Sequence, residues 1–192
     1  MSGSASVVRL FVAVPVPERP CFEAARTATD QARPGAYRWL SPVSLHCTLV
    51  FLGPMSSGDV PSICDRLSLL RSPAFESFAH KTRVFQQGPE RGVLALVVGT
   101  VPRDTRDVDE WSALEREVST CLANFAAPDR RQFRPHVSIG RSRRGHRPFP
   151  VPKIDPPLVD RFLVDRVNLV QSHPGPDGST YEDLLTVMLA GP

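Results

Sequence analysis

The spacing of apolar residues divides the chain into short segments that predict strands. Nearly continuous apolar runs at residues 9–16 and 93–98 predict buried strands, because a strand that is covered on both faces shows no polar alternation. Other runs predict strands at residues 45–52, 78–87, 133–141, 162–171 and 181–189. A hairpin loop at residues 173–178 is expected to join the last two strands.

Apolar residues at helical spacing predict helices between several of these strands. A helix with a proline in its first turn fits residues 20–33, and another fits residues 59–70. The clearest helix, at residues 108–125, carries one apolar stripe made of Trp111, Leu114, Val118, Cys121 and Phe125. The order of elements is an α+β pattern with an approximate internal repeat, whose halves are about residues 7–90 and 91–190.

Composition favours one globular domain. The 192 residues fit a single domain over residues 1–192, and a hydrophobic fraction of 41% is ample for a core. The four cysteines show no C-x-x-C spacing, so we interpret them as reduced residues of a cytoplasmic protein. We find no signal peptide and no apolar run near the ~20 residues of a membrane span, so no membrane partner is expected.

Positive charge is concentrated in one part of the chain. The net charge of only +3 argues against a generic polyanion binder, but residues 130–147 contain many arginines and no acidic residue. The planar guanidinium suits phosphate recognition. A compositional preference for arginine would also account for the arginines of residues 130–147. The arginines from Arg141 to Arg147 fit either a solvated loop or a contact with an RNA backbone.

Two of the predicted strands carry the same His-x-hydroxyl pattern, about half a chain apart. Side chains two positions apart share one face of a strand, so His46 and Thr48 lie together in the first, and His136 and Ser138 lie together with Arg134 in the second. Apolar residues occupy the opposite face of each strand. One such histidine is most often structural, whereas the matched pair points to catalysis.

Two facing imidazoles suggest acid–base chemistry at phosphorus. One imidazole can act as base and the other as acid for in-line displacement, since both exchange protons near neutral pH. The hydroxyls of Thr48 and Ser138, with Arg141 or Arg134, could hold the non-bridging oxygens. A metal site on the two histidines is disfavoured, because neither motif contains a carboxylate or a further histidine.

These motifs resemble those of the 2H phosphoesterase superfamily, and within it the RNA 2′,3′-cyclic phosphodiesterases, also called LigT-like or 2′-5′ RNA ligase-like proteins. The resemblance covers most of the chain. It rests on residues 9–14, Trp39, residues 45–53, residues 133–138, Arg141, residues 169–172, Tyr181 and Glu182. This chain has Ser138 where the family often has Thr, which keeps the hydroxyl, and Cys47 where Leu is common.

The resemblance implies a bilobal α+β fold, with antiparallel sheets from two pseudo-symmetric lobes and outer helices around a central cleft. It implies an RNA 2′,3′-cyclic 3′-phosphodiesterase that opens the cyclic phosphate with water, without metal or other cofactor, to give a 2′-phosphomonoester. His46 would protonate the leaving 3′-oxygen and His136 would activate the water. Thr48, Ser138 and Arg141 would bind the phosphate.

Alternative functions stay open at this point. Some relatives join RNA ends through a 2′-5′ bond or cleave 2′-5′ oligonucleotides, and a binding protein could keep the cleft without turnover. The expected partners are RNA with 2′,3′-cyclic phosphate ends or small cyclic nucleotides, bound by a monomer.

Arg141 and Phe51 occupy equivalent positions, five residues after His136 and His46 respectively. Strict alternation would put Arg141 on the wrong face, unless Gly140 supplies a bulge or a strand end. Phe51 could flank the ribose or base. The remaining histidines, His80, His146 and His173, are interpreted as surface or loop residues, and Trp39 and Trp111 as core residues.

Overall fold

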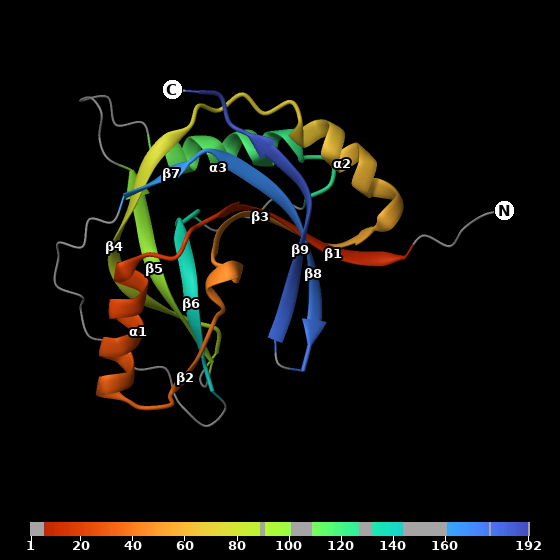
Figure 1. Cartoon of the computed structure of the whole chain (residues 1–192). Helices are drawn as coiled ribbons and strands as arrows, with labels where there is room; N and C mark the ends of the chain where they lie inside the picture. The colour runs from red at the N-terminus through yellow and green to blue at the C-terminus, as the bar shows by residue number, and fades with distance from the viewer. Residues whose placement is uncertain are drawn as a thin grey trace.

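A computed structural model describes residues 6–88, 91–100, 109–126, 132–143, 161–176 and 178–191 (Figure 1). The strands are β1 (Val7–Pro15), β2 (Tyr37–Trp39), β3 (His46–Ser56), β4 (Phe75–Gln86), β5 (Gly92–Thr100), β6 (His136–Ser142), β7 (Arg161–Val164), β8 (Arg166–Gly175) and β9 (Gly178–Met188). The helices are α1 (Pro20–Ala32), α2 (Val60–Leu67) and α3 (Glu110–Cys121), with 3₁₀ turns η1 (Pro42–Ser44) and η2 (Ser57–Asp59).

The strands form one curled sheet in the order β7-β4-β5-β6-β3-β1-β8-β9, and β2 pairs with the free part of β6. Neighbouring strands are antiparallel throughout this order. The junction between β3 and β6 is the narrowest, since a single registered pair, Cys47 with Val137, joins them. The prediction of an α+β fold with antiparallel strands and outer helices is confirmed.

The two predicted halves of the chain exchange strands within the sheet. Going outward from the junction, β6 is followed by β5 and β4, and β3 is followed by β1 and β8. Thus β4, which follows β3 in the chain, pairs with β5, whereas β8 returns to pair with β1. The sheet therefore does not divide at residue 90, because each side of the junction combines strands from both predicted halves.

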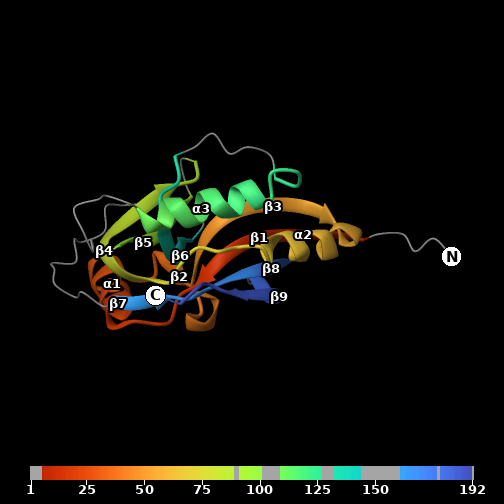
Figure 2. The same ribbon diagram turned by 90° about the horizontal axis from the view of Figure 1, so that it is seen from above.

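Helix α3 contributes the largest side chain of the core. Trp111, Leu114 and Val118 are fully buried at helical spacing, as predicted, and α3 packs against β3 and β5 (Figure 2). Burial of each such side chain contributes about 1.5–3 kcal/mol. The indole Nε1 of Trp111 donates to Ser77 Oγ at 3.0 Å, so its polar atom is also satisfied. Within the described ranges, no helix combines the length and apolar character needed to span a membrane.

The segment predicted as one strand at residues 162–171 is two strands, β7 and β8, with Asp165 between them. The reason is tertiary: β7 pairs with β4 on one side of the sheet and β8 pairs with β1 on the other. The backbone oxygen of Asp165 at this break accepts a hydrogen bond from Leu189 N at 2.8 Å. The β8–β9 hairpin is also longer than expected, because pairing continues to Gly175 and Gly178 in the predicted loop.

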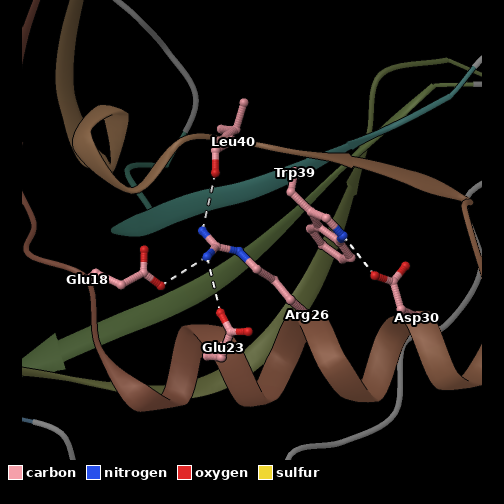
Figure 3. Close-up of polar contacts among 6 residues, drawn as sticks. All are labelled: Glu18, Glu23, Arg26, Asp30, Trp39 and Leu40. Atoms are coloured by element: carbon pink, nitrogen blue, oxygen red, sulfur yellow. Dashed lines mark hydrogen bonds and ion pairs between the residues drawn. The ribbon is translucent and has the colours of Figure 1, made fainter.

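Strand β2 is held in place by side chains of α1 (Figure 3). The guanidinium of Arg26 donates to Leu40 O at 3.3 Å and pairs with Glu18 at 3.0 Å. The indole Nε1 of Trp39 donates to Asp30 at 2.9 Å. This anchored indole lies over Gly140 of β6, where a β-carbon would stand only 2.7 Å from the ring. Glycine is therefore required at position 140, where β6 pairs with Trp39 of β2.

We expect Gly140→Ala to lower the free energy of unfolding by about 1–3 kcal/mol, because the added methyl group must displace the Trp39 ring and break its bond to Asp30. Chemical denaturation monitored by circular dichroism measures the change. Gly191→Ala is the matched control, since a β-carbon there meets no atom within 4 Å. Equal midpoints for the two variants would show that the ring does not constrain this position.

Candidate active site

The β3–β6 register brings the two His-x-hydroxyl motifs together. Cys47 and Val137 are paired in an antiparallel ladder. One residue to either side, the same register places His46 beside Ser138 and Thr48 beside His136, all on the face opposite the two apolar side chains. Cys47 and Val137 are both fully buried, whereas the four polar residues are partly accessible. The arrangement is a square of two imidazoles and two hydroxyls with approximate two-fold symmetry.

Both imidazoles are oriented by equivalent hydrogen bonds. His46 Nδ1 lies 2.7 Å from Ser44 O, and His136 Nδ1 lies 2.8 Å from Arg134 O. A carbonyl oxygen can only accept, so each Nδ1 carries a hydrogen and donates it. In the neutral ring Nε2 is therefore the free acceptor. Each histidine thus presents the nitrogen that can take up or release a proton.

A β-bulge in β6 determines where Arg141 lies. Ile139 has no partner on β5, so the register shifts by one residue after Ser138. Arg141 then pairs with Val93, which lies on the same face of β5 as the residues opposite His136 and Ser138. The bulge therefore returns Arg141 to the face of the histidines, as needed for a role in phosphate binding.

Strand β3 has an equivalent bulge. Leu49 has no partner on β1, and Phe51 pairs with Phe11, on the same face of β1 as the residues opposite His46 and Thr48. The side chain of Phe51 is 67% exposed, so it is available to a ligand.

Aromatic rings surround both histidines. The ring centre of Phe11 lies 5.0 Å from that of His46, and Tyr181 meets the same imidazole edge-on at 5.2 Å. Phe85 lies 4.5 Å from His136. None of these three aromatics was predicted as a site residue, because all three are far from the histidine motifs along the chain. Phe11 and Tyr181 belong to the segments that carry the family resemblance, whereas the only signal for Phe85 is its position on a predicted strand.

Basic side chains share this face. Across the intervening strand β5, the register aligns Lys81 of β4 with His136 and Arg83 with Ser138. The Arg83 guanidinium lies 5.3 Å from the Phe85 ring centre. These residues were also missed, although Lys81, Arg83 and Phe85 alternate along a predicted strand. Their charges favour an anionic ligand on this face.

The environment of His46 differs from that of an exposed histidine. Burial is the main cause that lowers its pKa below the usual 6.5, and the positive charges of Arg141 and His136 act in the same direction. The hydrogen bond to Ser44 O and the carboxylate of Asp183 oppose the shift. His46 is therefore predominantly neutral at pH 7 in the ligand-free protein.

The carboxylate of Asp183 is held by a buried amide. Asn168 Nδ2 donates to Asp183 Oδ2 at 2.7 Å, and Asn168 is 5% exposed. Cys47 lies between His46 and Thr48 in β3, and burial raises the pKa of its thiol to about 12. This cysteine stays protonated at neutral pH and is unsuited to act as a nucleophile.

Neither His173 nor Arg134 is part of this square. His173 pairs with Glu182 at 3.1 Å on the β8–β9 hairpin, whereas His146 and the side chain of His80 lie outside the described residues. Arg134 is exposed, and its contact with the site is the carbonyl that orients His136. Four of the seven arginines in segment 130–147 also lie outside the described residues: Arg130, Arg131, Arg144 and Arg147. In the described part, no three His, Cys, Asp or Glu side chains gather as metal ligands.

We expect Arg141→Gln to raise the pKa of His46, because removing a nearby positive charge favours the imidazolium. Titration of the imidazole nitrogens by NMR measures the shift. Arg116→Gln, an exposed change on α3, should leave this pKa unaltered. An unchanged His46 titration in Arg141→Gln would place the guanidinium away from the imidazole.

Solved structures share this fold. The chain superposes on a Thermus thermophilus protein, TT0787, with a TM-score of 0.72 at 24% identity, over 95% of this chain and 98% of that one. Escherichia coli LigT in its apo form gives a TM-score of 0.70 at 20% identity, over 97% of this chain and 99% of LigT. LigT has also been solved in complex with 3′-AMP, with a TM-score of 0.69 at 21% identity, over 96% of this chain and 99% of LigT.

Sequence comparison gives the family. The chain is 26% identical over 152 residues to an RNA 2′,3′-cyclic phosphodiesterase of Geobacillus stearothermophilus. The match covers 72% of this chain but 43% of that protein, so the chain spans less than half of its relative's length. The family model of the 2′-5′ RNA ligase superfamily matches residues 15–176, which include both histidine motifs. This chain therefore belongs to the 2′-5′ RNA ligase superfamily, a group of 2H phosphoesterases.

Proposed function

We propose that this protein hydrolyses 2′,3′-cyclic phosphate ends of RNA or nucleosides to 2′-phosphomonoesters. The observation that carries the proposal is the antiparallel pairing of β3 with β6, which puts two Nδ1-anchored imidazoles and two hydroxyls on one face. The Geobacillus relative is named for this activity, which supports the choice of reaction.

The square suits in-line displacement at phosphorus. A phosphate placed over Cys47 and Val137 would lie between the two imidazoles, with a nucleophile entering from one side and a leaving oxygen departing from the other. The hydroxyls of Thr48 and Ser138 would donate to the non-bridging oxygens. The guanidinium of Arg141 would stabilise the negative charge that develops on these oxygens.

The acid is the histidine that protonates the leaving oxygen, and the base is the histidine that accepts the proton of the attacking water. We propose that His46 protonates the departing ribose 3′-oxygen and that His136 takes the proton of water, so that the phosphate stays on the 2′-oxygen. The lowered pKa of His46 opposes this assignment in the ligand-free protein, because an acid must be protonated. A bound phosphate anion raises the pKa of a neighbouring imidazole and so favours the protonated form.

Formation or cleavage of a 2′-5′ bond is the second candidate. With a 5′-hydroxyl in place of water, the same acid and base in the same roles would join it to a 2′,3′-cyclic end through a 2′-5′ bond. With the roles exchanged, the 3′-hydroxyl would attack, the 5′-oxygen would leave, and the 2′-5′ bond would be cleaved. Membership of the 2′-5′ RNA ligase superfamily favours this candidate over a binding protein without turnover. The intact pair of histidines and hydroxyls also argues against loss of catalysis.

We expect a nucleoside 2′,3′-cyclic phosphate to be hydrolysed at an unchanged rate in excess EDTA, because the proposed proton transfers need only imidazoles. The product should be the 2′-phosphate alone, as resolved by chromatography against 2′- and 3′-phosphate standards. A protein heated to unfolding serves as the control. Loss of activity on chelation, or a 3′-phosphate product, would contradict the mechanism.

We expect His46→Ala and His136→Ala each to lower kcat by about 10²–10⁴, the usual contribution of a general acid or base. A 4-nitrophenyl phosphodiester, whose leaving group departs without protonation, should be cleaved by His46→Ala far better than by His136→Ala. The comparison of the two substrates isolates the acid step. If the 4-nitrophenyl substrate were instead cleaved well by His136→Ala and poorly by His46→Ala, His136 would be the acid and His46 the base.

A further inference from the structure

A basic cavity of about 620 Å³ adjoins the histidine face. Its lining residues come from both sides of the β3–β6 junction: one part is the tip of the β8–β9 hairpin, and the other is the ends of β2, β5 and β6. The lining side chains that carry charge are Arg38, Arg91, Arg141 and Arg143. No acidic residue occurs in the described part of the lining, so the cavity favours an anion.

The backbone that carries these arginines is fixed by hydrogen bonds. Gln87 N donates to Arg91 O at 2.7 Å, which closes the β4–β5 connection. Gly92 N donates to Ser142 Oγ at 2.8 Å, and Arg143 N donates to Ala36 O at 3.0 Å. The guanidiniums of Arg91 and Arg143 therefore project from ordered positions, which reduces the entropy that a ligand must remove.

The hairpin tip packs against the remaining wall. Gly178 has a φ of +117°, and a β-carbon there would lie 2.9 Å from the guanidinium of Arg38. The close approach of this glycine to β2 brings the two sides of the cavity together. The cavity is therefore part of the folded arrangement of the hairpin and not a gap between independent loops.

The cavity and the histidine square share Arg141. This residue lowers the pKa of His46 and also lines the cavity, so the two regions are continuous. Arg141 pairs with Val93 and Ser138 with Ala95, two residues apart on β5. At about 3.3 Å per residue of strand, Arg141 therefore lies roughly 7 Å beyond Ser138 along the sheet. A group bound in the cavity is thus separate from the phosphate at the histidines but within reach of the same substrate molecule.

We propose that this cavity binds a second phosphate of the substrate, the one on the 5′-oxygen of the nucleoside that carries the cyclic phosphate. Guanidinium groups bind phosphate oxygens through paired charge-assisted hydrogen bonds. The inference rests on the proposed function and narrows its substrate class to RNA ends and 5′-phosphorylated nucleotides. A nucleoside with only the cyclic phosphate leaves the cavity empty.

Three substrates test this assignment by kcat/KM: a nucleoside 2′,3′-cyclic phosphate, its 5′-phosphorylated form, and a dinucleotide with the same cyclic end. Both substrates with a second phosphate should exceed the first by about tenfold, and added salt should reduce this advantage. Equal values for all three would overturn the proposal. An advantage confined to the dinucleotide would assign the effect to the second nucleoside and overturn the phosphate site.

Variants of the cavity arginines test whether the advantage of a second phosphate arises in the cavity. Arg91→Gln and Arg143→Gln should each lower the ratio of kcat/KM between the 5′-phosphorylated and unphosphorylated substrates by about tenfold, whereas Arg116→Gln on α3 should leave the ratio unchanged. If the ratio is unchanged in Arg91→Gln and in Arg143→Gln, the second phosphate does not bind in this cavity.

Binding of products separates this inference from the proposed function. Calorimetry should show that a nucleoside 2′,5′-bisphosphate binds about tenfold more tightly than the 2′-monophosphate, with a difference that Arg91→Gln and Arg143→Gln abolish. If no cyclic phosphate is hydrolysed but this difference persists, the proposed function fails and the second phosphate site stands. Equal affinities would overturn the second site.

Discussion

The pairing of Cys47 with Val137 is the contact on which the site depends. It is the only registered pair between β3 and β6 in the described sheet, yet it joins two arms: β7, β4, β5 and β6 with β2 alongside, and β3, β1, β8 and β9. Because Cys47 and Val137 point into the core, the polar residues before and after them in each strand must point to the opposite face of the sheet. A slip of one residue in either strand would turn a histidine and a hydroxyl into the core. The apolar packing under the sheet therefore determines the relative positions of the two histidines and the two hydroxyls.

The near-symmetry of the site is broken by what surrounds it. Each imidazole donates from Nδ1 to a carbonyl two residues earlier, and each is followed by a bulge that returns the fifth residue to the same face. On one side that residue is Phe51, and on the other it is Arg141. Burial beside Phe11 and Tyr181 lowers the pKa of His46. Equivalent backbones thus hold two imidazoles in different electrostatic environments, as an acid–base pair requires.

The local part of this arrangement could be predicted from the sequence, whereas the non-local part could not. Alternation in residues 45–52 and 133–141 correctly grouped each histidine with its hydroxyl, because the period of a strand is a local property. The face of Arg141 depended on a bulge whose position is set by pairing with β5. The contacts of Phe85 and Tyr181 with the histidines, and the break at Asp165, depend on which distant strands become neighbours. The catalytic roles of His46 and His136 stay predictions.

The exchange of β4 and β8 has a consequence for how the chain folds during synthesis. Strand β1 is made first, but its neighbour on the outer side is β8, more than 150 residues later in the chain. Such distant pairing slows folding, since a long loop must close before the contact forms. The first histidine strand then stays attached to an incomplete arm until β8 has left the ribosome. A nascent chain that lacks β8 would expose the edge of β1, so the β8–β9 hairpin covers an aggregation-prone edge as well as lining the basic cavity.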